Sequence, residues 1–439
     1  MKKIGILLTA ISLIIFGCKK TENLDREIVG LGGDTWPKTA LDTWLYDTFT
    51  KPYNIAVKYR WDGTEQDPNF TLVPPKTENV KPLMEMVNNA WINPYVDLMG
   101  ANFIKTYAPK NYVLIGSVRY NSGGTVTLGE AGGGVKITLF NVNNYDATSR
   151  AVSKRILKTI HHEFAHILHQ TTMFQKEYQY ITPSGYTADW NNATGFYNKG
   201  FISQYAQAAP QEDFVEMIAL MVTEGRNGYE VLTRNITDAT ALAAVRQKQG
   251  MVTAYLKQTW NVEIESIQSK VQAAINQRAP ENAGDYFAFG ADKLPILTVN
   301  PIADPISSTT FNTIYDNTVT GLAGVGGAGR ILDQFALIRT SATQMTLRLY
   351  YRNTAGSAFT ADFVYNVTNN ANGTFSLTYV SRDANADVIA AGVTSLTNFL
   401  VGGRQLGVKY YYNANNTRQY TGIYDFNNQD TYMYGFLSY

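Results

Sequence analysis

One stretch of the sequence reads Thr159-Ile-His-His-Glu-Phe-Ala-His-Ile-Leu-His-Gln170, and it holds all four histidines of a 439-residue chain. Only His162 starts the pattern His-Glu-x-x-His, which His166 completes. Residues four apart lie about 40° apart around a helix, so both imidazoles can reach one metal ion from the same face. Glu163 sits beside that face, where it can accept a proton from a water on the metal. The stretch therefore predicts a catalytic metal centre.

The histidines fall inside the clearest helix pattern of the chain, residues 150–170. Apolar residues recur there at spacings of three and four and predict one buried stripe along the helix. Around this helix, the periodicity predicts further helices at 40–49, 80–98, 211–224, 239–260 and 263–277, and strands at 53–61, 112–118 and 135–140. The strand at 135–140 is either the edge that pairs with an extended substrate or an ordinary sheet strand. This mixture predicts an α+β fold for residues 36–290.

A catalytic zinc ion needs a third protein ligand and one open position. A histidine six positions after His166 would complete one known zinc pattern, but Thr172 stands there. His169 lies on the same helix face, but three ligands on one straight helix would span about 10 Å along its axis. Contact with a ligand histidine is therefore the better expectation for His169.

A carboxylate from a second helix is the other source of a third ligand. The segment Pro210-Gln-Glu-Asp-Phe-Val-Glu-Met217 starts the next clear helix, with proline at a position typical of helix starts. Glu212 and Glu216 lie four residues apart, so both can face the histidine helix. Asp213 is the alternative to Glu212, although its side chain points about 100° away around the helix.

These two segments resemble the gluzincin metallopeptidases, in which a downstream glutamate completes the zinc site and an acidic residue follows four positions later. The local pattern is most similar to the catalytic domain of anthrax lethal factor. The resemblance implies Zn²⁺ as cofactor, Glu212 as third ligand and Glu216 as the residue that orients a ligand histidine. It also implies a tyrosine near the reacting carbonyl, seven residues before the ligand glutamate, where Tyr205 stands. The implied activity is hydrolysis of peptide bonds in a peptide or protein substrate.

The N-terminus reads as a targeting segment. Lys2 and Lys3 precede an apolar run that ends at Gly17, which is too short to span a membrane as a helix. The ending Ile15-Phe16-Gly17-Cys18 resembles a bacterial lipobox, which implies removal of residues 1–17 and lipid attachment at Cys18. A short buried helix is the alternative. Residues 18–35 are polar and then glycine-rich, as expected of a flexible tether.

The whole chain, lipobox included, is similar to zinc-metallopeptidase lipoproteins of Bacteroidota associated with starch-utilisation-type outer-membrane importers. That resemblance implies an outer-membrane lipoprotein facing the periplasm or the cell surface, with an importer complex as a partner. A non-catalytic substrate-binding lipoprotein that serves such an importer is the alternative function. Glu163 favours the enzyme, because a structural zinc ion needs no general base.

Composition excludes two other classes of protein, nucleic-acid binders and proteins held together by disulfides. Lys plus Arg (37) and Asp plus Glu (36) nearly cancel, whereas a nucleic-acid binder normally carries a basic excess. With one cysteine, the chain has no internal disulfide framework.

Composition also changes near residue 290, where we place a domain boundary. The last glutamate is Glu281, and after Lys293 the only lysine is Lys409. Alternating apolar residues predict strands at 345–351, 363–367, 375–379 and 406–412, with a hairpin turn at Asn372-Gly373. Residues 291–439 are therefore expected to form an all-β sandwich or barrel, with one short helix near 393–400.

Overall fold

The structure, a computed structural model, describes residues 36–65, 67–121, 126–132 and 135–439. The predicted signal peptide (1–17), Cys18 and the tether (18–35) lie outside these residues. The chain divides into two compact units between Trp44 and Leu45, and the structure describes the first of them over residues 36–44. The predicted boundary near residue 290 falls inside the second unit and stays a prediction.

In the first unit, Thr39 caps the start of helix α2 (Ala40–Leu45). The Thr39 backbone N–H donates to the Asp42 carboxylate (2.7 Å), and the Asp42 N–H donates back to the Thr39 hydroxyl (3.3 Å). Such a reciprocal pair satisfies two N–H groups that a helix start leaves free.

A small mixed sheet lies near the start of the second unit. Its strand order is β1 (Ala56–Lys58), β2 (Asn111–Leu114), β6 (Lys136–Leu139) and β5 (Gly129–Gly132). The first three strands are parallel, and β5 is antiparallel to β6. Because β6 has neighbours on both sides, the reading of 135–140 as a substrate-pairing edge is wrong. The edge strands are β1 and β5, and β5 was not predicted from the sequence.

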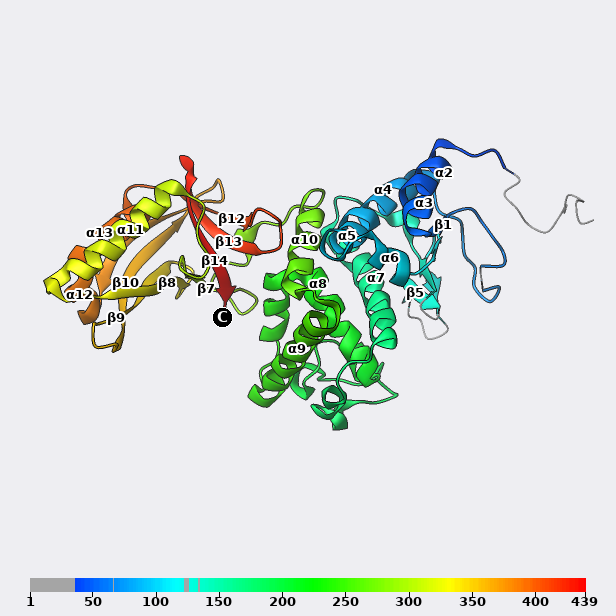
Figure 1. The fold of residues 1–439 in the computed structure, drawn as a ribbon, viewed down its shortest axis with the longest axis horizontal. Helices are drawn as coiled ribbons and strands as arrows, with labels where there is room; N and C mark the ends of the chain where they lie inside the picture. Colours follow the sequence, from blue (N-terminus) through cyan, green and yellow to red (C-terminus); the bar gives the residue numbers. More distant parts are fainter. Residues whose placement is uncertain (1–35, 66, 122–125, 133–134) are drawn as a thin grey trace, which may run out of the picture. The chain divides into compact units, whose positions relative to one another are not determined.

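Most of the other regular structure in the N-terminal half of this unit is helical (Figure 1). A separate two-stranded hairpin joins β3 (Arg119–Tyr120) and β4 (Val126–Thr127). The helices are α3 (Lys51–Tyr53), α4 (Thr77–Val87), α5 (Asn93–Met99), α6 (Ala101–Tyr107), α7 (Arg150–Thr171), α8 (Pro210–Arg234), α9 (Ala239–Trp260) and α10 (Ile264–Asn276), with π-helical turns at Tyr46–Thr50 and Asn88–Ile92. The predicted helices at 80–98, 150–170, 211–224, 239–260 and 263–277 are confirmed to within a few residues at most ends, and α8 continues further.

Helix α7 starts where its sequence favours a start. The Ser149 hydroxyl accepts a hydrogen bond from the Val152 N–H (3.4 Å), which caps the helix. Its apolar stripe is buried, with Leu157, Ile160 and Phe164 fully covered. These residues hold the middle of the helix against its neighbours.

Helix α8 contains a break at Gly225, where φ is +69°. Side chains of α10 satisfy the carbonyls that the break releases: Gln268 donates to the Met221 carbonyl (2.6 Å), and Gln272 donates to those of Val222 (3.1 Å) and Thr223 (2.9 Å). The predicted helix end at Glu224 coincides with this break, after which the chain resumes a helix to Arg234.

The C-terminal part forms a closed eight-stranded antiparallel barrel, in the order β10-β11-β12-β13-β14-β7-β8-β9. The strands are β7 (Ile296–Val299), β8 (Ile331–Arg339), β9 (Gln344–Arg352), β10 (Ala358–Asn369), β11 (Phe375–Arg382), β12 (Leu406–Tyr412), β13 (Gln419–Asp425) and β14 (Asn428–Ser438). The predicted β domain is confirmed, with the barrel rather than the sandwich. Gly373 adopts a φ of +79° between β10 and β11, as the predicted hairpin turn requires.

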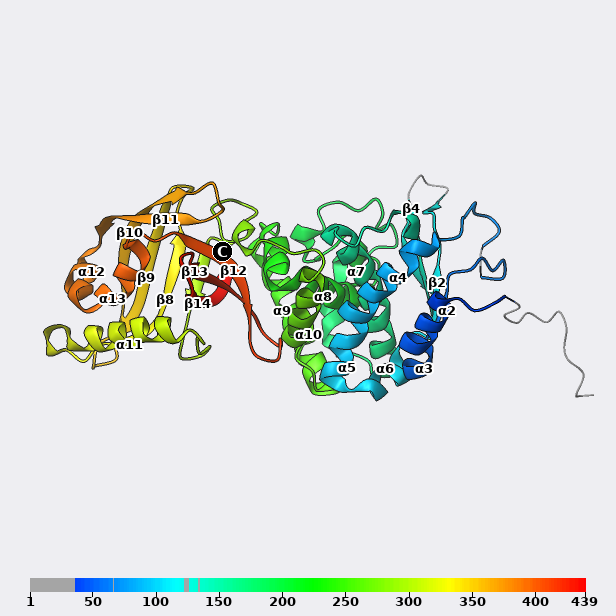
Figure 2. The same cartoon turned by 90° about the horizontal axis from the view of Figure 1, so that it is seen from above.

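Three helices accompany the barrel strands: α11 (Thr309–Gly324), α12 (Ala384–Ile389) and α13 (Thr394–Val401). Helix α11 runs along the barrel, and its buried Phe311 and Leu322 belong to the barrel core (Figure 2). Helix α13 matches the predicted helix near 393–400, whereas α11 was not predicted. Among the described helices, none alone has the length and hydropathy of a membrane span; Ala384–Gly392 and Thr394–Val401 reach them only as a pair bent by 96°.

Candidate metal centre

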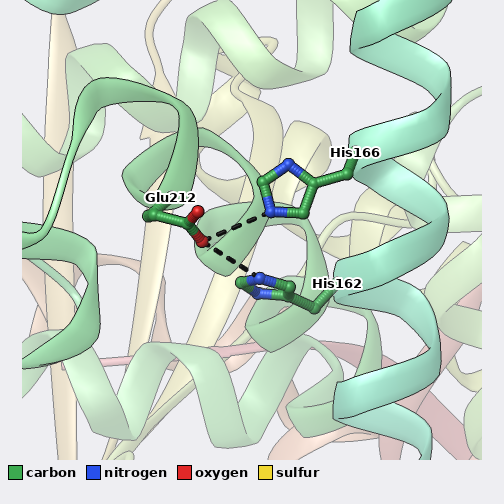
Figure 3. Close-up of side chains that lie close together, drawn as sticks. All are labelled: His162, His166 and Glu212. Carbon is green, nitrogen blue, oxygen red and sulfur yellow. Dashed lines mark hydrogen bonds and ion pairs between the residues drawn. The ribbon is translucent and has the colours of Figure 1, made fainter. Parts of the chain in front are cut away.

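Three potential ligands from two helices meet at one point. His162 and His166 project from α7, and Glu212 projects from the first turn of α8 (Figure 3). The Glu212 Oε2 lies 3.2 Å from His162 Nε2 and 3.3 Å from His166 Nε2. The potential ligand atoms of the three residues all lie within 4.8 Å of one another. Among the described residues, this is the one group of histidine, cysteine and carboxylate side chains close enough to hold a metal ion.

Two sides of this triangle have the spacing that zinc requires. Zinc binds histidine nitrogen and carboxylate oxygen at about 2.0–2.2 Å in a tetrahedral arrangement, which places neighbouring ligand atoms about 3.3 Å apart. The two distances from Glu212 Oε2 to the imidazoles match that spacing. Two histidines and one glutamate also leave the fourth position of a tetrahedron open, as a catalytic zinc site requires.

Glu216 lies behind His162, one turn along α8 from Glu212. Its Oε1 lies 2.9 Å from His162 Nδ1, the nitrogen that faces away from Glu212. The same oxygen lies 2.8 Å from Lys158 Nζ, and the Ser203 hydroxyl donates to Oε2 (2.6 Å). Glu216 is 1% exposed, so its carboxylate contacts these protein groups instead of bulk water. The contact leaves Nε2 of His162 free to bind a metal, since Nδ1 carries the proton that faces the carboxylate.

The other two histidines lie outside the triangle. His169 Nε2 is 2.9 Å from His166 Nδ1, so His169 contacts a potential ligand and not the metal position. His161 is buried on another face of α7, where its Nδ1 lies 3.2 Å from the Tyr95 hydroxyl. Burial lowers the pKa of His161 to about 3, which keeps this imidazole neutral. Packing in the core is the role that the structure gives to His161.

The carboxylates and imidazoles of the site shift one another's pKa values. Burial alone would lower the pKa of His162, but its hydrogen bonds with Glu212 and Glu216 raise that pKa to about 9. Burial would raise the pKa of Glu216, but His162 and Lys158 lower it to about 2. The pKa of Glu212 is likewise lowered, because its hydrogen bonds with His162 and His166 outweigh its burial. Both glutamates are therefore ionised at neutral pH, as metal ligation and histidine orientation require.

Glu163 differs from these two acids. It is partly buried on α7 beside the ligands, and burial raises its pKa, opposed by the charges of His162 and His166. A carboxylate whose pKa moves toward neutrality is better suited to take up and release a proton.

Tyr205 lies next to the same triangle. Its ring is 5.8 Å from the His162 ring, centroid to centroid, and the Trp190 ring packs against it at 4.7 Å in a T-shaped contact. Burial and the charge of Glu212 raise the pKa of Tyr205, so the phenol keeps its proton. The Gln204 side chain fixes the turn that carries Trp190, through hydrogen bonds to the carbonyls of Trp190 (3.0 Å) and Asn191 (2.9 Å).

Asp213, the alternative third ligand, points elsewhere. Its side chain is fully buried, and its Oδ2 lies 2.6 Å from Lys248 Nζ on α9. It is not part of the triangle. The 100° step around the helix between residues 212 and 213 explains why only one of them faces α7.

Three of the polar residues around the site were not predicted from the sequence: Lys158, Ser203 and Lys248. Lys158 stands four positions before His162, so helical spacing alone could have placed it on the metal face. Ser203 lies in an irregular segment, where no periodicity locates a side chain. Lys248 interrupts the buried stripe of α9 that includes Val245 and Val252, and a charged residue in such a stripe was a usable signal.

Comparison with known proteins bears on the same region. Residues 34–265, more than half of the chain, match a family model described as "putative zinc-binding metallo-peptidase". Among solved structures, the chain is similar to a "putative zinc-binding metallo-peptidase from Bacteroides caccae ATCC 43185", with 32% identity and a TM-score of 0.48 over 54% of this chain and 91% of that one. None of the curated proteins compared with the chain matches it.

Proposed function

The chain belongs to this family of zinc-binding metallo-peptidases, and we propose that it is an active zinc-dependent peptidase that hydrolyses peptide bonds. The observation that carries the proposal is the His162–His166–Glu212 triangle, in which Glu212 Oε2 lies 3.2 and 3.3 Å from the two imidazoles. Zinc, when bound there, supplies a Lewis acid and a water acidic enough to ionise near neutral pH.

In the proposed reaction, Glu163 is the general base. It takes a proton from the attacking water and later passes that proton to the leaving amine. Its partial burial and raised pKa support this role, because the carboxylate must both accept and release a proton. The alternative of a non-catalytic binding protein gives Glu163 no purpose.

Two further side chains act around this step. Tyr205 would donate a hydrogen bond from its protonated hydroxyl to the oxyanion that develops on the substrate carbonyl. Glu216 holds the Nδ1 proton of His162 and so keeps Nε2 directed at the metal position. His169 acts in the same way on His166, through its Nε2 at 2.9 Å.

The proposal extends to location and partners. Lys2, Lys3 and the lipobox-like sequence before Cys18 support a lipid anchor on that cysteine, in an outer-membrane lipoprotein that faces the periplasm or the cell surface. Its substrates would be peptides or proteins, and its partner an outer-membrane importer complex. Incorporation of labelled fatty acid by the full chain, but not by a Cys18→Ala variant, tests the anchor. Incorporation by both, or by neither, would reject Cys18 as the attachment point.

The activity is tested with purified full chain, zinc-loaded, against a mixture of unstructured peptides. We expect cleavage by the wild type, and we expect a Glu163→Gln variant to keep its zinc but lose activity by a factor of about 10² or more. Zinc binding without cleavage by the wild type would instead favour the binding protein.

A further inference from the structure

A fully buried ion pair lies one residue away from Glu212. The side chains of Asp213 in α8 and Lys248 in α9 are both 0% exposed, and Lys248 Nζ lies 2.6 Å from Asp213 Oδ2. The proposed reaction uses neither residue. A buried ion pair contributes little net stability compared with apolar side chains of the same volume, because both charges lose their hydration. Its presence here is therefore not explained by stability alone.

Both members of the pair also bind the segment that connects α7 to α8, residues 172–209. Lys248 Nζ donates to the Gly200 carbonyl (2.8 Å) and lies 4.0 Å from the centre of the Phe201 ring. The Tyr186 hydroxyl donates to Asp213 Oδ2 (2.9 Å). The pair thus joins three parts of the fold: the first turn of α8, helix α9 and the connecting segment.

The connecting segment carries two of the groups that surround the metal centre. Ser203, two residues after Phe201, donates to Glu216, and Tyr205 follows two residues later with its ring 5.8 Å from that of His162. On the other side of the pair, Asp213 follows Glu212 directly. A shift of the pair would therefore move Glu212 from one side and the Ser203–Tyr205 stretch from the other.

We propose that Lys248 and Asp213 are positioning residues, which set where Glu212 and the Ser203–Tyr205 stretch lie relative to the two histidines of α7. Hydrogen bonds and ion pairs have preferred directions and distances, whereas apolar contacts are non-directional. A directional link can hold a ligand carboxylate to the few tenths of an ångström that a metal site needs. This inference rests on the proposed role of Glu212 as a metal ligand.

The test replaces the pair by neutral side chains of similar volume, Lys248→Met with Asp213→Asn, in the full chain. Co²⁺ is the probe, because its visible absorption reports the geometry of its ligands and its titration gives an affinity. We expect the double variant to bind Co²⁺ at least tenfold more weakly than the wild type, with a changed absorption spectrum, because groups outside the ligands that position them typically contribute a factor of about 10 to 100 to metal affinity.

A matched control exists on the same two helices. Arg246 of α9 lies 2.5 Å from Glu230 of α8, beyond the Gly225 break and away from the ligands. Arg246→Met with Glu230→Gln should leave the Co²⁺ affinity within twofold of the wild type and its spectrum unchanged. If both double variants weaken Co²⁺ binding equally, or neither does, the pair is only a structural support and the inference is wrong.

Tyr186→Phe decides the matter if the Lys248 and Asp213 double variant does not fold. It removes one hydrogen bond to Asp213 and keeps the ring, and we expect it to weaken Co²⁺ binding about threefold with an altered spectrum. An unchanged affinity and spectrum would overturn the inference.

Failure of the proposed function gives a different result. A wild type that binds no Co²⁺ rejects the metal site and this inference together, whereas a wild type that binds Co²⁺ but cleaves no peptide rejects only the peptidase.

Discussion

The Nδ1 of His162 lies 2.9 Å from Oε1 of Glu216, and that oxygen also lies 2.8 Å from Lys158 Nζ. A buried carboxylate that is paired with a cation stays ionised, and an ionised carboxylate fixes the tautomer of the imidazole it contacts. The metal-binding nitrogen of His162 is therefore oriented from behind by two residues that do not reach the metal position.

Replacing Glu216 tests this orientation. We expect Glu216→Gln to lower zinc affinity by a factor of about 10 to 100, as loss of an outer carboxylate typically does. Competition titration with a chelator measures the affinity. The control is Glu224→Gln, which removes another ion pair between α8 and α7, that of Glu224 with Lys154 at 2.6 Å. Equal losses of zinc affinity in the two variants would contradict a specific role for Glu216.

Zinc binding should depend on pH. Without a metal, the hydrogen bonds of Glu212 and Glu216 outweigh burial and raise the pKa of His162 to about 9, so this imidazole carries a second proton, on Nε2, at pH 7. Zinc must displace that proton, and zinc affinity should therefore rise about tenfold per pH unit up to pH 9 and level off above it. Isothermal titration at pH 6, 7 and 8 measures the slope. An affinity that stays constant over that range would show that His162 is already neutral in the metal-free protein.

Tyr205 should affect the reaction and not the metal. Tyr205→Phe removes the hydroxyl, the one donor that we assign to the oxyanion among the side chains, and loss of such a donor costs about 10² to 10³ in kcat. Zinc content should stay at the wild-type value, and KM should change little. Steady-state kinetics with a cleaved peptide decides this, and an unchanged kcat would remove Tyr205 from the mechanism.

Two glycines inside helices should respond in opposite ways to alanine. Gly225 has a φ of +69°, and an added Cβ would lie 2.7 Å from Gln272 Cγ, so Gly225→Ala should destabilise the fold by about 2 kcal/mol or more. Gly250 lies on the exposed face of α9 with nothing within 4 Å of an added Cβ. Gly250→Ala should stabilise by about 0.4 to 1 kcal/mol. Denaturant titration gives both values, and a stabilising Gly225→Ala would show that the break in α8 is not required.

Local patterns in the sequence predicted the parts of the site that lie on regular helices. The spacing of His162 and His166 and that of Glu212 and Glu216 are helical, so pattern alone aligned them. Lys248 contacts Asp213, and Ser203 contacts Glu216. Each contact joins two different segments of the chain, so the periodicity within one segment does not predict it. The continuation of α8 past Gly225 was not predicted for the same reason, because it depends on side chains of α10.

The barrel, too, was predicted only in part from local patterns. Alternation predicted four of its eight strands, β9 to β12, because inward and outward residues alternate along a strand. The choice of barrel over sandwich depended on the pairing of β7 with β14, the first and last strands of the barrel, which closes the sheet through contacts that alternation does not specify. Helix α11 was missed because its sequence, Thr309–Gly324, is rich in threonine and glycine, which favour helices weakly.

The most direct measurement of the central claim is the position of bound zinc, located by anomalous scattering at the zinc edge from crystals of the zinc-loaded chain. The account predicts one ion bonded to His162 Nε2, His166 Nε2 and a Glu212 carboxylate oxygen, each at about 2.0 to 2.2 Å. An ion bonded to His169 or Asp213 in place of Glu212, or no ion at the triangle under zinc-replete conditions, would contradict it.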